Sequence, residues 1–428
     1  MDQAVETRRS TVRVGKNAVA LLSAQVATKL LALMLVGMIA RYEGAAGLGR
    51  YVLITTVMAL AAAISDLGLT TLLTRDTASR RSRLHQRLLL SHVLPLRMAL
   101  AALATGLLLG AAWTPFFPSQ SRGLFFVGAL SLLPQAATGV LGGFVNGRRR
   151  MEISSAITVV VRLVTLAGAV PALAAGFGVT GVVACRAAAE ALGVLSYVLV
   201  LRRWRLLPQP RLLPTEWRET LSDAYPFAMT GIIAMAYRRL DVVLLSAWQG
   251  DVAAGQYGAA YKLWEAVGLI PASLLDAMFP ELARLAQAGN GHLRLRRILR
   301  RTGPLVVAGG FLLSGVSAAL AAWLMPVVYG RAQAQQGAIT AFRLQVWSVP
   351  AMFLYLLCGH TLYALDRQRW VTGAMAVVGL FNVGLNLLVI PRWSTLGVSG
   401  VAVLSAWLLA ALLATLVIRA LRDEEETV

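Results

Sequence analysis

The sequence predicts an all-α integral membrane protein with about 12 transmembrane helices in two six-helix lobes around a central cavity. Hydrophobic residues make up 57% of the 428 residues and gather in long runs. A bilayer core takes about 20 apolar residues as a helix, and an open strand would leave its edge amides unpaired in lipid. The expected spans are 17–40, 48–73, 88–111, 122–146, 153–175, 179–201, 224–247, 257–280, 303–328, 342–364, 370–391 and 396–419.

Basic residues fall on alternate sides of these spans. Of the 40 Lys and Arg residues, 27 lie in the N-terminus, in every second loop or in the C-terminus, whereas six lie in the intervening loops. Short loops rich in Lys and Arg stay on the cytoplasmic side of a membrane. The sequence therefore predicts an even number of helices with both termini in the cytoplasm.

The net charge of +20 does not indicate a nucleic-acid-binding protein, because it is divided among seven short cytoplasmic segments. Clusters such as 148–150 and 294–301 are expected either to set the topology or to meet anionic lipid headgroups. The basic, amphipathic segment 281–302 is expected to form a short helix on the inner surface. Both cysteines lie inside predicted spans, so neither a structural disulfide nor a metal site is expected.

Two pairs of short segments indicate an internal duplication. Residues 44–51 read GAAGLGRY and residues 250–257 read GDVAAGQY, with Gly, Gly and Tyr at the same spacing. Residues 178–182 and 397–401 share the pattern Gly-Val-Thr/Ser-Gly-Val. Each pair lies at equivalent positions between helices of the two halves. Six helices per repeat imply parallel repeats, with a cavity between them.

The duplication also predicts the domain boundaries. We expect an N-terminal lobe at 1–201, a basic cytoplasmic linker at 202–223 and a C-terminal lobe at 224–428. Prolines in the linker interrupt any continuous helix through it; these are Pro208, Pro210 and Pro214.

Charged residues inside the spans are the candidate site residues, because a charge at mid-bilayer costs about 2.5–3.5 kcal/mol on insertion scales and persists mainly in a protein-lined or wet interior. The basic candidates for binding an anionic substrate are Lys29, Arg162, Arg186, Arg238 and Lys262. The acidic candidates, for ion coupling or for structural ion pairs, are Asp66, Asp241, Glu265 and Asp276.

Spacing offers a structural explanation for some of these charges. Arg186–Glu190, Arg238–Asp241 and Lys262–Glu265 are three or four residues apart, which places opposite charges on one helix face. Lys29, near the middle of its span, either faces the cavity or pairs with Asp66. Arg97 lies near the inner end of its span and is expected to snorkel to the membrane surface. The excess of basic residues favours an anion, and phosphate suits Arg and Lys best.

Several short motifs follow one another along the whole chain at matching helix positions. They are Ala40-Arg41-Tyr42-Glu43-Gly44, Asp66-Leu67-Gly68-Leu69, Arg75-Asp76, Arg239-Leu240-Asp241, Ala260-Tyr261-Lys262, Pro280-Glu281-Leu282 and Leu385-Asn386. In these motifs the chain resembles the polysaccharide biosynthesis family, the Wzx-type O-antigen and exopolysaccharide flippases. These belong to the superfamily of multidrug, oligosaccharidyl-lipid and polysaccharide exporters.

The resemblance implies a flippase of the bacterial inner membrane, which moves an undecaprenyl-diphosphate-linked glycan from the cytoplasmic to the outer leaflet. It implies neither a cofactor nor an enzymatic activity, and other polysaccharide assembly proteins become candidate partners beside anionic lipids. The family's motif residues carry over only to Asp66, Arg75, Asp241 and Lys262. Arg75 lies in its motif at the cytoplasmic end of a span.

Two other functions remain open at this point. A membrane-embedded glycan polymerase or ligase would be expected to have a large outer loop with catalytic residues, and the sequence shows neither this loop nor a Gly-x-Ser-x-Gly motif. A cation or drug extruder of the same fold would favour acids without local partners, such as Asp66 and Asp276.

Overall fold

The structure is a computed structural model that describes residues 2–79, 82–113, 122–209, 214–287, 291–330 and 336–426. Side chains are described from residue 23 onward, apart from 214–216, 230, 291 and 424–426. Pro210 of the expected linker lies outside the described residues. Within the described ranges the chain is helical and contains no β-strand, which confirms the all-α prediction.

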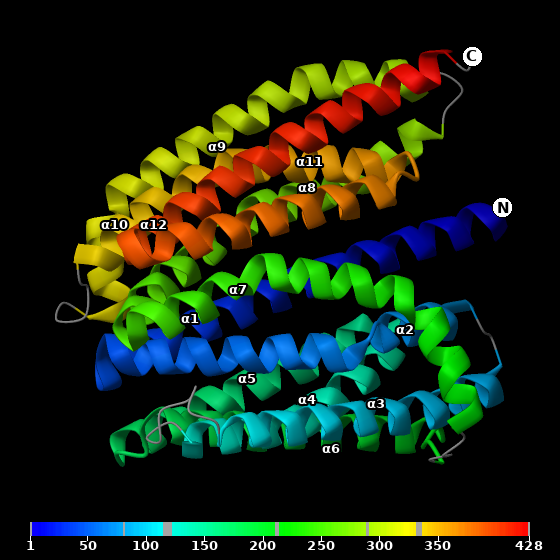
Figure 1. Cartoon of the computed structure of the whole chain (residues 1–428). Coiled ribbons are helices and arrows are strands. Elements are labelled where there is room, and N and C mark those ends of the chain that lie inside the picture. The colour runs from blue at the N-terminus through cyan, green and yellow to red at the C-terminus, as the bar shows by residue number, and fades with distance from the viewer. Residues whose placement is uncertain are drawn as a thin grey trace. The chain divides into compact units, whose positions relative to one another are not determined.

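The helices follow one another with short connections (Figure 1). They are α1 (Asp2–Asp66), α2 (Leu69–Ser79), α3 (Arg83–Ala111), α4 (Arg122–Gly147), α5 (Met151–Ala174), α6 (Gly178–Arg203), α7 (Pro214–Val267), α8 (Leu269–Ala286), α9 (Gly291–Tyr329), α10 (Gln336–Gln345), α11 (Val349–Ala364) and α12 (Gln368–Glu426). A 3₁₀ turn, Val346–Ser348, joins α10 to α11.

Nine helical stretches among the described residues are long and apolar enough to cross a membrane. Three of these stretches, in α1, α7 and α12, contain a non-helical residue: Gly44, Gly250 and Ser394 respectively. Dividing them at these residues gives twelve segments, in agreement with the predicted number of spans. The chain is therefore a multi-pass membrane protein.

One predicted span is interrupted by residues with positive φ angles. The span expected at 48–73 ends as a helix at Asp66, and α2 starts at Leu69. Leu67 and Gly68 both have positive φ angles, 45° and 75°. Hydropathy did not reveal this break, because leucine and glycine are both compatible with an apolar run.

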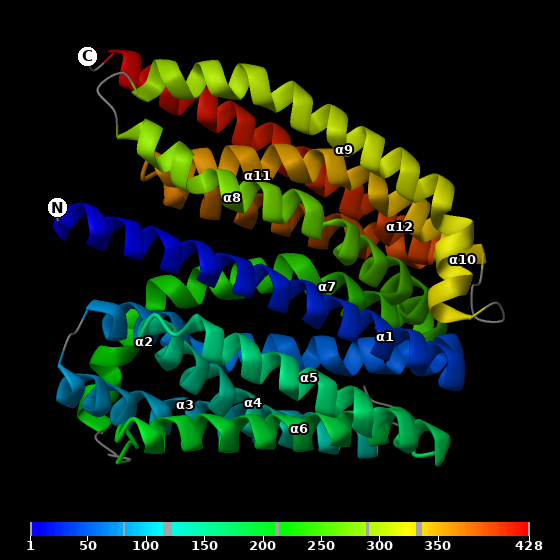
Figure 2. The ribbon, with the colours of Figure 1, turned by 180° about the vertical axis from the view of Figure 1, so that it is seen from behind.

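The chain forms two compact units. The first comprises residues 1–42 and 54–232, and the second comprises residues 43–53 and 233–428. In the first unit α4 packs against α3 and α6, and α6 also packs against α5; in the second, α11 packs against α8, α9 and α12 (Figures 1 and 2). These boundaries differ from the expected lobes, because 43–53 packs with the second unit and the start of α7 with the first.

The two segments that reveal the duplication cross each other closely within the second unit. Gly44 and Gly250 have φ angles of 71° and 78°, a conformation that glycine adopts without a steric penalty, and each makes a kink. After these kinks, a Cβ on Gly49 would lie 1.8 Å from the carbonyl oxygen of Asp251, and a Cβ on Gly255 would lie 1.9 Å from that of Ala45. The contacts are reciprocal, so glycine is required at both positions.

The beginning of α7 is part of the core of the first unit. Ala224 is buried there with Leu69 and Leu73 of α2 and Tyr197 of α6, and Trp217, Leu221 and Phe227 pack against this cluster. This packing of apolar side chains explains why residues after the linker belong to the first unit.

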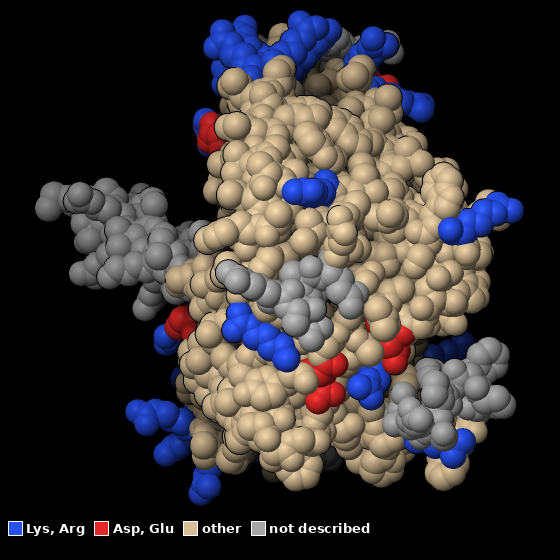
Figure 3. Space-filling model, turned by 90° about the vertical axis from the view of Figure 1, so that its left-hand side faces the viewer, with Lys and Arg blue, Asp and Glu red and all other residues tan. Residues whose placement is uncertain are grey.

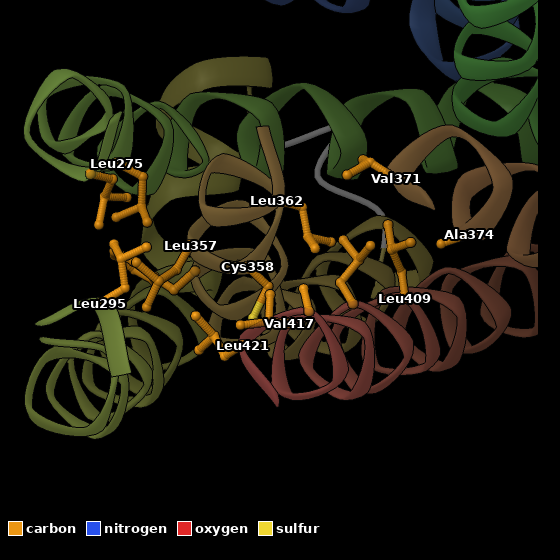
Figure 4. Packing of buried hydrophobic residues seen from close by; sticks show 14 of the residues in the cluster. Leu275, Leu295, Leu357, Cys358, Leu362, Val371, Ala374, Leu409, Val417 and Leu421 are labelled. Carbon is orange, nitrogen blue, oxygen red and sulfur yellow. The ribbon is translucent and has the colours of Figure 1, made fainter. Parts of the chain in front are cut away.

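The core of the second unit corrects the expectation for segment 281–302. The segment is not a separate surface helix: α8 ends at Ala286, and from Gly291 onward the basic residues form the first turns of the 39-residue helix α9. Leu295 is fully buried and packs in a cluster that includes Leu275 of α8 and Leu357 of α11 (Figure 4). Because Leu295 is buried in this cluster, the basic first turns of α9 are held in line with the rest of the helix.

Large apolar side chains are exposed along the helices, including Leu107, Leu305, Leu312, Leu380 and Leu388, each at least 67% exposed. The face shown in Figure 3 is mostly uncharged, with scattered Lys, Arg, Asp and Glu side chains. An apolar surface of this extent is typical of a protein surrounded by lipid.

Candidate functional site

A polar network in the second unit is formed by the two stretches of α7 on either side of Gly250. The kink at Gly250 folds α7 so that the Tyr257 hydroxyl donates a hydrogen bond to the Asp241 carboxylate. Asp241 is 8% exposed, and its Oδ1 also accepts a hydrogen bond from the Val242 N–H, 2.7 Å away. Two donors thus stabilise the Asp241 carboxylate inside a membrane-spanning region.

The expected ion pair between Arg238 and Asp241 is not formed. Arg238 instead lies within electrostatic reach of Tyr261 and Glu265. The i,i+3 spacing makes a pair possible on an isolated helix, but the kink provides other partners for both groups. Sequence spacing within one stretch of α7 contains no information about the second stretch that packs beside it.

Basic and aromatic side chains continue the network around Tyr261. The Arg239 guanidinium lies 5.0 Å from the Tyr261 ring centre, a cation–π arrangement. The Tyr261 and Trp264 rings are 5.3 Å apart. The ion pair that spacing suggested between Lys262 Nζ and Glu265 Oε2 is present, at 2.8 Å. Four of the candidate residues, Arg238, Asp241, Lys262 and Glu265, therefore belong to one network.

A second polar cluster in this unit was missed by the search for charges. Asn386 donates to Asn382 at 3.0 Å, Asn382 donates to Ser405 at 2.9 Å, and all three are buried. The Asn386 Oδ1 atom is buried without a hydrogen-bond partner among the described residues. Two asparagines four residues apart in an apolar span are a signal that could have indicated this cluster.

In the first unit, Asp66 pairs with Arg97. Arg97 Nε lies 3.2 Å from Asp66 Oδ1, and Arg97 also donates to Ser65 at 2.8 Å and to the carbonyl of Ala62 at 3.2 Å. The Arg97 side chain is 5% exposed, so the expectation that it snorkels is wrong. Thr70 donates to the same Asp66 oxygen at 2.6 Å.

The remaining basic candidates of the first unit lie on separate helices. Lys29 is half-buried in α1, Arg162 in α5 and Arg186 in α6. The expected pair of Arg186 with Glu190 is not formed among the described residues; Glu190 accepts a hydrogen bond from Thr138 of α4, at 3.0 Å. The neighbouring helix therefore satisfies Glu190 in place of the nearest basic residue.

Asp276 and Arg75 lie in more exposed places. The Asp276 side chain is 63% exposed and lies 3.2 Å from His360 Nε2 of α11. Arg75 is an exposed residue of α2, where its Nε lies 2.8 Å from Asp76 and its guanidinium lies over Phe227. Neither residue is part of the network around Tyr261.

The network contains groups of the kinds that bind anions and pack against rings. Arg238, Arg239 and Lys262 supply three cations, whereas Glu265 and Asp241 supply two acids, of which Asp241 is already engaged by Tyr257. Guanidinium groups bind phosphate oxygens with two parallel hydrogen bonds. The Tyr261 and Trp264 rings, whose centres are 5.3 Å apart, add a surface on which an apolar or planar ligand face can pack.

The fold is that of a helical protein with many candidate membrane spans. It is similar to the lipid II flippase MurJ in an inward closed conformation (TM-score 0.77, 14% identity, covering 94% of this chain and 89% of that chain). It is also similar to a multidrug resistance MATE family transporter of the MOP superfamily in an inward-facing conformation (TM-score 0.70, 14% identity, 96% and 99% covered). A MOP superfamily transporter from Pyrococcus furiosus matches with a TM-score of 0.61, 15% identity, and 96% and 95% covered.

The sequence supports a narrower assignment. The model of the family described as "Polysaccharide biosynthesis protein" matches residues 14–286, and the chain belongs to this family. None of the curated proteins compared with the chain matches it significantly. At 14–15% identity the structural similarities establish the fold alone. The expected membership of the polysaccharide biosynthesis family is confirmed.

Proposed function

We propose that the protein is a flippase that moves an undecaprenyl-diphosphate-linked oligosaccharide from the cytoplasmic to the outer leaflet of the bacterial inner membrane. The observation that carries the proposal is the basic and aromatic network around Tyr261 in a membrane-spanning region. The family and the similarity to a lipid II flippase support the same class of substrate. A diphosphate would bind the guanidinium groups, and the sugars would pack near the aromatic rings.

Transport would proceed by alternating access between an N-terminal lobe at 1–201 and a C-terminal lobe at 224–428, joined by the linker. The lipid tail stays in the bilayer, because leaving it would lose apolar burial. In the first lobe, Lys29, Arg162 and Arg186 provide further positive charge for the headgroup.

An inside-negative membrane potential assists outward movement of an anion, by about 2.3 kcal/mol per charge per 100 mV. The proposed reaction makes and breaks no covalent bond, so it requires neither catalytic residues nor a cofactor.

A second candidate function is cation or drug export. The observation that favours it is the Asp241 carboxylate, which is buried in a span and has the Tyr257 hydroxyl as its side-chain donor. A carboxylate in this position can take up a proton or a sodium ion, and similar folds include multidrug transporters. The two candidate functions differ in the transported substrate and in the residue that transport requires.

Replacing Arg238 with glutamine is expected to slow flipping about tenfold, because the loss of one charge-assisted hydrogen bond costs at least about 1.4 kcal/mol. Arg238→Lys should retain part of the activity through its charge. The assay is the transfer of a labelled lipid-linked oligosaccharide across vesicles, with potential and ion gradients clamped separately. Arg343→Gln is the matched control, since Arg343 Nε donates to the carbonyl of Ala318 and is exposed.

The export alternative predicts a different pattern in the same vesicles. Asp241→Asn would abolish gradient-driven movement of a cationic drug, while Arg238→Gln would leave it intact. Unchanged oligosaccharide flipping in Arg238→Gln, together with drug efflux that requires Asp241, would replace the flippase proposal with the exporter.

The proposed orientation predicts the result of reporter fusions. A phosphatase fused after residue 250 is expected to be active outside the cytoplasm, and a fluorescent protein fused after residue 210 to fold inside it. The reason is that Lys and Arg in short loops are retained on the cytoplasmic side. Activity of the opposite reporter at both sites would show an inverted topology.

A further inference from the structure

Three arginines lie at the ends of helices that pack together in the first unit, since α4 packs against both α3 and α5. Arg148 and Arg150 lie in the short connection between α4 and α5, and Arg83 is the first residue of α3. Burial, followed by the positive charges of Arg83 and Arg150, lowers the pKa of Arg148. These like charges repel one another, so their proximity is unfavourable unless an anion lies between them.

Arg148 is held in place but its hydrogen-bonding capacity is not used up. Its guanidinium lies 4.9 Å from the ring centre of Trp204, the residue directly after α6. Its Nη1 atom is buried and has no hydrogen-bond partner among the described residues. A buried donor that carries charge and lacks an acceptor is unfavourable, so an acceptor from outside the chain fits this position.

Neighbouring groups limit where that acceptor can lie. Arg150 Nη1 is paired with Glu152 Oε1 at 3.2 Å, and Glu152 Oε2 is buried without a hydrogen-bond partner. This carboxylate repels an anion on the Arg150 side. Arg87 is also engaged, since its Nε donates to the carbonyl of Leu207 at 2.8 Å. Of the four described arginines Arg83, Arg87, Arg148 and Arg150, this leaves the guanidinium groups of Arg83 and Arg148 for an anion.

We propose that Arg83 and Arg148 form a binding site for a phosphate group, supplied by the headgroup of an anionic phospholipid. Two guanidinium groups match the oxygens of a phosphate and neutralise its charge. Arg148 follows directly after Gly147, the last residue of a membrane-spanning helix, which places it at headgroup depth. Trp204 beside it is the residue type enriched at this interface. The assignment of the phosphate to a lipid headgroup rests on the proposed membrane orientation. It does not depend on which substrate is transported.

Native mass spectrometry of the full chain in detergent tests the site. Phosphatidylglycerol is expected to bind more tightly than phosphatidylcholine, and Arg83→Ala/Arg148→Ala should weaken phosphatidylglycerol binding about tenfold. Arg122→Ala is the matched control, because Arg122 also lies over a tryptophan, Trp113, at 5.3 Å, but at the other end of α4. Circular dichroism measures whether each variant is folded. If the double variant is unfolded, the single variant Arg83→Ala provides the test, because it changes an exposed residue.

The outcomes separate the sources of the phosphate. Binding of phosphatidylglycerol that inorganic phosphate does not displace supports a lipid site. Equal competition by millimolar inorganic phosphate would overturn the lipid assignment in favour of a soluble phosphate. Parent-like phosphatidylglycerol binding by the folded double variant would overturn the site itself. None of these measurements depends on flipping, so failure of the proposed function would not produce the same result.

Discussion

Replacing Gly255 with alanine is expected to lower the stability of the second unit by at least about 3 kcal/mol, the upper end of usual overpacking costs. The new Cβ would lie 1.9 Å from the carbonyl oxygen of Ala45 and 3.0 Å from the Gly49 nitrogen. Both are backbone atoms, so no rotamer change relieves the clash and the two segments must separate. The measurement is thermal unfolding of the purified protein in detergent.

Matched variants identify the cause of this effect. Gly49→Ala should be equally damaging, because its Cβ would meet the carbonyl oxygen of Asp251 at 1.8 Å. Gly373→Ala is the control, since nothing lies within 4 Å of its added Cβ. Alanine there should be neutral or stabilise by up to about 1 kcal/mol through helix propensity. Unfolding temperatures of Gly255→Ala and Gly373→Ala that agree within error would refute the close crossing.

Removal of Arg97 is the second change with a large expected effect. Arg97→Leu leaves the Asp66 carboxylate, 24% exposed, with Thr70 but without its cation. Breaking a buried ion pair by removing one partner costs about 3–5 kcal/mol. Asp66→Leu should cost a similar amount, because it leaves the buried guanidinium uncompensated. Thermal unfolding and protease resistance in detergent measure both losses.

The double variant Arg97→Leu/Asp66→Leu should be more stable than the sum of the single losses predicts, because two apolar residues replace the pair. The control is Arg75→Leu, which removes the cation of an exposed pair with Asp76 and should cost less than about 1 kcal/mol. Additive losses in the double variant would mean that Arg97 and Asp66 do not interact.

Much of the architecture was predictable because hydropathy and charge asymmetry are properties of the linear chain. The predicted number of spans agrees with the twelve helical segments, and the matched glycines at 44 and 250 are the kinks that separate two pairs of them. Gly49 and Gly255 were also identified by the repeat. Their direct contact was not predictable, since a repeat indicates equivalence and not proximity.

The site was predictable only in part. Spacing suggested the Lys262–Glu265 pair, which forms because both residues lie on one helix turn within the same stretch of α7. Spacing failed for Arg238–Asp241, because the second stretch of α7 brings Tyr257 to Asp241. The site roles of these residues remain proposals, which the Arg238 variants test.

The sequence by itself determined the membrane class, the number of spans and the family, because long apolar runs and short ordered motifs are readable without knowledge of the fold. Only the tertiary structure decided which charges on different helices meet. Asp66 and Arg97 are on different helices, and the rotation of each helix, set by packing, brings them within 3.2 Å. Packing in the second unit likewise buries Leu295 in the first turns of α9, and the burial of one apolar side chain fixes the position of its helical neighbours, which include the basic residues.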